Sequence, residues 1–109
     1  MADKKRRELN LSSYARVRDD APTMEAYRIL RTNIEFSGKQ KQYKTLLMTS
    51  SIMQEGKSTT VSNLGRVFAM AGTKTLIVDL DLRRPIQHRL LAVDNTIGIT
   101  DLYLGNASL

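Results

Sequence analysis

The stretch TLLMTSSIMQEGKST, residues 45–59, decides the fold of this chain. It opens with a short apolar, β-rich run, residues 45–49, and ends on Gly56-Lys57-Ser58, the second half of the phosphate-loop pattern G-x-x-x-x-G-K-[ST]. In that pattern backbone N–H groups cradle phosphates, the lysine pairs with their charge and the hydroxyl holds Mg²⁺. Ser51 stands where the pattern has its first glycine. Taken alone, the match is a weak signal.

The residues after the loop supply the context that a phosphate loop needs. Apolar residues follow at helical spacing from Lys57 to Ala71, and Gly72 is suited to end that helix. A second β-rich run, residues 75–78, comes next, and a β-loop-α-β unit makes its two strands parallel. We therefore predict an α/β fold, a P-loop NTPase-like parallel sheet with flanking helices that is truncated at Leu109.

Two acids, Asp79 and Asp81, close the second run. Residues two apart in an extended segment face the same side, so both carboxylates point one way. If the two runs are neighbouring strands, the acids and the loop meet at the carboxyl edge of the sheet, where open α/β sheets bind ligands. The alternative is that Lys57 and Ser58 merely begin a helix while the acids cap a strand in solvent. The order of strand, loop, helix and acids favours a nucleotide-and-magnesium site.

Three motifs resemble those of the bacterial tyrosine kinases that accompany exopolysaccharide and capsule synthesis, within the deviant P-loop (Walker A/A′) ATPases. Residues 50–59 are similar to the phosphate loop of that family. Residues 76–83 are similar to its second nucleotide motif, three apolar residues followed by Asp-x-Asp-x-Arg. Residues 25–31 fit its oligomerisation motif, Glu-x-x-Arg-x-x-Arg. The resemblance extends from about Glu25 to the C-terminus.

The resemblance implies ATP and Mg²⁺ as cofactors and a role for each matching residue. The implied ATP-binding residues are Gln54, Glu55, Gly56, Lys57, Ser58 and Thr59. The implied catalytic residues are Lys57, Asp79, Asp81 and Arg83. Ser58 and Asp79 would hold the metal, Asp79 through its water shell. Asp81 would be the general base for a tyrosine hydroxyl, and Arg83 would orient the acids. The implied contact between copies of the chain consists of Glu25, Arg28 and Arg31.

Departures from the family pattern leave a second function in view. Met53 and Gln54 stand where the family generally has Pro-Gly, so the loop loses a residue that tolerates positive φ. The rival is a nucleotide-dependent assembly module like the chromosome-partitioning and cell-division-site ATPases. Those proteins have a lysine at the position of Ile52 and lack the arginine at that of Arg83, so the kinase is favoured. Because the family's Walker B acid and tyrosine cluster would fall beyond Leu109, we expect this chain to be inactive alone.

Charge divides the chain into two parts. The net charge is +6, and basic residues crowd the N-terminal end. We predict a basic, flexible tail over residues 1–21 and the N-terminal part of a kinase or ATPase domain over residues 22–109. The tail is either simply solvated or attracted to anionic lipid or an acidic partner. Aromatic residues do not interleave with its basic ones, so nucleic acid is not an expected partner.

Composition and resemblance together predict where the protein acts. The chain has no cysteine and no apolar run near the roughly 18 residues of a membrane span, which predicts a cytoplasmic protein. The resemblance implies tyrosine-containing protein substrates and a membrane-anchored activator. Such an activator would hold the protein at the inner face of the plasma membrane.

Overall fold

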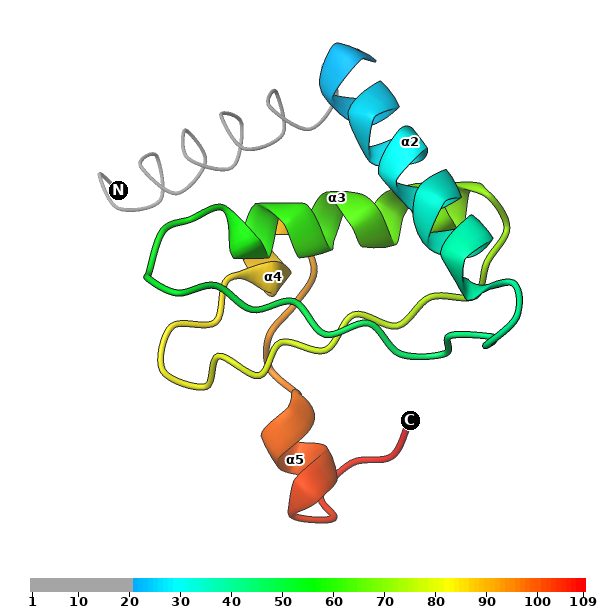
Figure 1. Ribbon diagram of the computed structural model, residues 1–109. Coiled ribbons are helices and arrows are strands. Elements are labelled where there is room, and N and C mark those ends of the chain that lie inside the picture. Colours follow the sequence, from blue (N-terminus) through cyan, green and yellow to red (C-terminus); the bar gives the residue numbers. More distant parts are fainter. Residues whose placement is uncertain (1–20) are drawn as a thin grey trace.

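The computed structural model describes residues 21–109, so the predicted basic tail lies outside the described part except for its last residue. This part contains the helices α2 (Ala21–Gly38), α3 (Lys57–Met70), α4 (Gln87–Leu90) and α5 (Ile99–Tyr103). Helix α3 is central: α2 packs across its C-terminal part and α4 against its N-terminal end (Figure 1). Among the described residues, no helix has both the length and the apolar character needed to cross a membrane.

Helix α3 lies between two glycines with left-handed backbone. Gly56 precedes it with φ of 80°, and Gly72 follows it with φ of 85°. The N–H of Gly72 donates to the carbonyl of Ala69 at 2.9 Å. The N–H of Thr73 donates to the carbonyl of Phe68 at 3.1 Å, which completes a Schellman motif. The helix predicted after the loop, with Gly72 as its terminator, is confirmed.

Helix α2 presents a stripe of little-exposed residues to α3. The stripe consists of Met24, Tyr27, Arg31 and Ile34, at steps of three, four and three. This spacing keeps the four side chains on one helix face. The apolar members pack on Leu64 and Val67 of α3, and Val67 is 0% exposed. One member of the stripe, Arg31, is charged, and its place in an apolar seam requires a polar partner.

The two runs predicted as strands, residues 45–49 and 75–78, are not helical, and no strand is assigned within the described part of the chain. Both lie against the helical core, because Met48 packs on the hydrophobic cluster and Ile77 approaches Gly65. No ladder of backbone hydrogen bonds joins the two runs there, and ladder pairing is what defines a strand in a sheet. The parallel sheet therefore stays a prediction.

One side of the second run is apolar and open to solvent. Leu76, Leu80 and Leu82 are each about two thirds exposed. Alternate residues of an extended segment point to opposite sides, which places Ile77 and Asp79 on the inner, half-buried side. The inner side of this run thus carries both the contact with α3 and the first of the two acids.

Gly65 allows α3 and the second run to approach. A Cβ at this position would lie 2.5 Å from Cδ1 and 2.9 Å from Cγ1 of Ile77. Alanine favours an exposed helix by about 1 kcal/mol over glycine. We nevertheless expect Gly65→Ala to lower the unfolding free energy by about 1–3 kcal/mol in urea, because Ile77 would be displaced. Adding Ile77→Val, which removes Cδ1, should recover part of the loss. A Gly65→Ala protein more stable than its parent would contradict this packing.

Candidate nucleotide and magnesium site

The phosphate loop is a turn that the side chain of Glu55 closes. The Glu55 carboxylate accepts hydrogen bonds from the N–H of Ser51 at 3.1 Å and the N–H of Ile52 at 3.4 Å. The Ser51 hydroxyl donates to the same carboxylate at 3.2 Å. The loop then runs directly into α3 at Lys57, which has no ion pair or side-chain hydrogen bond with any described residue. An exposed loop and an unpaired ammonium group at a helix N-terminus suit an anion.

Gln54 lies in the loop with left-handed backbone, at φ of 63°. This conformation costs a residue with a Cβ about 1–2 kcal/mol, whereas glycine adopts it freely. The sequence predicted that the loop lacks a residue tolerant of positive φ at Met53 and Gln54. The structure shows that the positive φ is retained and that glutamine carries the strain.

Replacing Gln54 tests this strain. Gln54→Gly should raise the unfolding free energy by up to about 1 kcal/mol, because the relief of strain exceeds the extra chain entropy of glycine in the unfolded state. Gln54→Ala keeps the Cβ and serves as the control, so it should not stabilise. Urea unfolding of the three proteins measures the difference. Equal stabilisation by alanine and glycine would assign the effect to loss of the glutamine side chain.

The carboxylate of Asp79 organises the segment that follows it. Its Oδ1 accepts the N–H of Asp81 at 3.0 Å, and its Oδ2 accepts the N–H groups of Ile86 and Gln87 at 3.0 and 3.1 Å. The last two donors lie at the start of α4, where a helix leaves N–H groups without internal partners. Oδ1 of Asp81 accepts the N–H of Arg84 at 3.0 Å. Both predicted site acids are therefore fixed to the backbone.

Gln87 joins the acid segment to the start of α3. Its Nε2 donates to the backbone carbonyl of Ser58 at 2.9 Å, while its own N–H donates to Asp79. The residue is only 7% exposed. Gln87 thus links Ser58 to Asp79, the two residues predicted to hold the metal, of which Asp79 would act through water. The sequence analysis assigned no role to Gln87. Its spacing of three from Leu90 in the short helix after Pro85 could have indicated that both residues are buried on one helix face.

The remaining predicted site residues are less constrained. Arg83 is exposed and forms no hydrogen bond with Asp79 or Asp81 in the described part, so its orienting role stays a prediction. Within residues 21–109 no group of three or more His, Cys, Asp or Glu side chains could hold a metal ion. A magnesium ion at Ser58 and Asp79 would therefore take further ligands from phosphate and water, as Mg²⁺ usually does.

The electrostatics of the turn between α4 and α5 differ from those of the site. A hydrogen bond from the side chain of Thr96 holds the pKa of Asp94 below its ordinary value, and the N–H of Asn95, at 2.9 Å, adds to the effect. Asp94 is exposed and is not one of the predicted site residues. Its carboxylate shapes this turn through contacts with its immediate neighbours.

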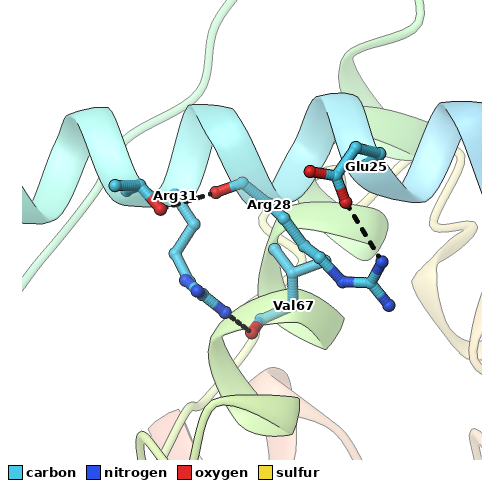
Figure 2. Close-up of polar contacts among 5 residues, drawn as sticks. Glu25, Arg28, Arg31 and Val67 are labelled. Carbon is cyan, nitrogen blue, oxygen red and sulfur yellow. Dashed lines mark hydrogen bonds and ion pairs between the residues drawn. The ribbon is translucent and has the colours of Figure 1, made fainter.

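The members of the predicted oligomerisation motif make two separate sets of contacts (Figure 2). Nη1 of Arg31 donates to the backbone carbonyl of Val67 in α3 at 3.0 Å, and Nε of Arg31 lies 3.7 Å from Oε1 of Glu35. Glu25 and Arg28 instead pair with each other at 3.3 Å, and both side chains are more exposed than that of Arg31. Self-association through the motif stays a prediction, and Glu25 and Arg28 are its accessible members.

Two arginine variants separate these environments. Arg31→Met should lower the unfolding free energy by about 1–2 kcal/mol, because it removes a charge-assisted hydrogen bond between α2 and α3. The loss is moderate because the carbonyl of Val67 also accepts the N–H of Ala71. Arg28→Met, the matched control, should change it by less than about 0.5 kcal/mol because Arg28 is exposed. Equal losses in urea unfolding would contradict the anchoring role of Arg31.

The sequence matches named bacterial proteins. It is 46% identical to the tyrosine-protein kinase YwqD of Bacillus subtilis over 85 residues, which are 78% of this chain and 36% of that protein. It is 41% identical to the tyrosine-protein kinase CpsD of Streptococcus agalactiae over 96 residues, 87% of this chain and 41% of that protein. It is 38% identical to the putative tyrosine-protein kinase CapB of Staphylococcus aureus, over 77% of this chain and 37% of that protein. No family model and no solved structure matches.

These matches include the candidate site. Any 85-residue stretch of a 109-residue chain contains residues 25–85, which hold the loop, both acids and the α2 motif. The chain spans about two fifths of the length of these relatives. The chain belongs to a class of nucleotide-dependent kinases, and it corresponds to part of the length of these relatives. That class is the bacterial tyrosine-protein kinases, and the resemblance inferred from the three motifs is confirmed.

Proposed function

We propose that this chain forms the phosphate-binding part of an autophosphorylating, ATP- and Mg²⁺-dependent protein tyrosine kinase that regulates exopolysaccharide and capsule synthesis. The observation that carries the proposal is the identity of 38–46% with proteins named tyrosine kinases over a stretch that includes loop and acids. The contacts of Gln87 with Ser58 and Asp79 add support, because they hold the ends of the two motifs together. ATP supplies the transferred phosphoryl group.

Each site residue has a defined task in this proposal. Lys57 pairs with the β- and γ-phosphates, and the Ser58 hydroxyl binds the magnesium ion. Asp79 holds the metal through water, and Asp81 accepts the proton of the tyrosine hydroxyl. Arg83 orients the acids. The loop N–H groups at the start of α3 stabilise phosphate charge without needing to reorganise.

The proposal extends to the surroundings of the site. Residues 45–49 and 75–78 would be neighbouring parallel strands in the complete kinase domain, which would also cover the exposed leucines. Self-association would use Glu25 and Arg28 on the open side of α2. The protein would act in the cytoplasm at the inner face of the membrane, bound to a membrane-anchored activator.

The rival is a nucleotide-dependent assembly module of the partitioning-ATPase kind. It shares the loop and the acids, so the geometry of the site is compatible with both. The relatives quoted above are named tyrosine-protein kinases, which favours the kinase. The two functions differ in whether phosphotyrosine is formed, and this difference can be measured.

Nucleotide binding is the first test. Titration calorimetry of this chain with ADP and Mg²⁺ should show binding, and Lys57→Met should weaken it at least about tenfold, because the lysine pairs with phosphate charge. Lys74→Met, which changes an exposed lysine beyond α3, is the matched control and should bind as the parent does. Equal affinities of the Lys57→Met and Lys74→Met proteins would remove Lys57 from the site.

Phosphotyrosine formation then separates kinase from module. A hybrid protein is made by replacing the matching segment of the Bacillus subtilis relative with this chain. The hybrid is then incubated with Mg²⁺ and ATP. We expect a phosphotyrosine signal that Asp81→Asn lowers by about 10²-fold or more, with nucleotide binding retained, as loss of a general base predicts. A hybrid that binds nucleotide but forms no phosphotyrosine would favour the assembly module.

A further inference from the structure

Gln87 is the point at which three separate parts of the chain meet. Its side-chain Nε2 donates to the carbonyl of Ser58, in the first turn of α3, at 2.9 Å. Its backbone N–H donates to Oδ2 of Asp79 at 3.1 Å. Its own position is fixed because it begins α4, whose Leu90 is 3% exposed. No other described residue is shown bonding to both Ser58 and Asp79.

The polarity of this side chain is not explained by packing. Oε1 of Gln87 is buried and has no hydrogen-bond partner among the described residues. A buried, unpaired amide oxygen destabilises a protein, because it loses its hydrogen bonds to water and gains none in return. Methionine has nearly the same length and shape and would fill the position without that penalty. Packing alone therefore does not require an amide here, and the bond to Ser58 is the feature that only the amide provides.

We propose that Gln87 is a positioning residue that sets the separation between Ser58 and Asp79, so that both can serve one magnesium ion. This inference rests on the proposed function, because it assigns the metal to those two residues. Mg²⁺ requires nearly ideal octahedral geometry, with ligands at about 2.0–2.1 Å, and tolerates little displacement. Altering a residue that hydrogen-bonds to a metal-binding group typically changes the metal affinity by about 10–100-fold.

Two hydrogen bonds of Gln87 connect Ser58 to Asp79. The carbonyl of Ser58 belongs to the same residue as the hydroxyl proposed to bind the metal, so fixing the carbonyl restricts the hydroxyl. Asp79 receives the N–H groups of both Ile86 and Gln87, so its carboxylate moves with the start of α4. Loss of the Gln87 amide would leave Asp79 attached to α4 but would remove the hydrogen bond that ties the start of α4 to the first turn of α3. The acid segment could then shift relative to the phosphate loop.

The test compares Gln87→Met with Gln40→Met in the full 109-residue chain. Gln40 is exposed in the turn after α2, so this control makes the same chemical change away from the site. The measurement is the Mg²⁺ concentration that gives half-maximal binding of a fluorescent ADP analogue. We expect Gln87→Met to raise it about tenfold or more and Gln40→Met to leave it unchanged. Binding of the analogue without Mg²⁺ should change by less than about twofold, because the loop itself is intact.

Thermal unfolding supplies the second readout. Gln87→Met removes the unpaired Oε1 together with the hydrogen bond, so its melting temperature should stay close to that of the parent. Gln87→Asn is a second variant, whose amide is one methylene too short to reach Ser58. It should show the same rise in required Mg²⁺ and keeps the test informative if the methionine variant does not fold.

The outcomes separate this inference from the proposed function. The inference alone is overturned if the parent chain binds the analogue with Mg²⁺ and the folded Gln87 variants need the same Mg²⁺ concentration as the parent. Equal weakening with and without Mg²⁺ also overturns it, because a merely structural role would act on the whole loop. A parent chain that binds no nucleotide overturns the proposed function and this inference with it.

Discussion

The burial of helix α3 positions the phosphate loop and the first of the two site acids. Val67 is wholly buried beneath α2, and its carbonyl receives the guanidinium of Arg31. Gly65 admits the side chain of Ile77 from the second extended run, and Ser58 is bonded to Gln87 at the other end of the helix. The loop leads directly into α3, and the acids directly follow the run that packs on it. Holding this one helix therefore holds both halves of the nucleotide site.

The two acids differ in how many backbone hydrogen bonds they accept. Asp79 accepts three backbone hydrogen bonds, and an ionised carboxylate has about four acceptor positions. The free capacity is small, which fits a group that holds a metal through water better than one that ligates it directly. Asp81 accepts one backbone hydrogen bond and is exposed, so it has more acceptor positions open to a substrate hydroxyl. Their different partners suit the different tasks proposed for them.

Local features of the fold could be predicted because they depend on neighbours in the sequence. The helix after the loop follows from apolar spacing and a terminating glycine, and it is found at Lys57–Met70 with Gly72 beyond its end. The strands at 45–49 and 75–78 are different, because a strand needs a partner with which to form a ladder. An apolar, β-rich composition indicates that such a run can form a strand, but it does not identify the segment with which the strand would pair.

The sequence by itself determined the order of the elements, the phosphate loop, the acid pair and the family. Only the tertiary structure decided which face of α2 is covered. Arg28 and Arg31 stand four and seven residues from Met24, both helical spacings, yet only Arg31 lies in the stripe that α3 covers. The role of Gln87 was likewise invisible, because the amide acts on Ser58, 29 residues away, as Arg31 acts 36 residues away on α3. Periodicity shows which residues share a face, whereas packing between distant segments decides what that face meets.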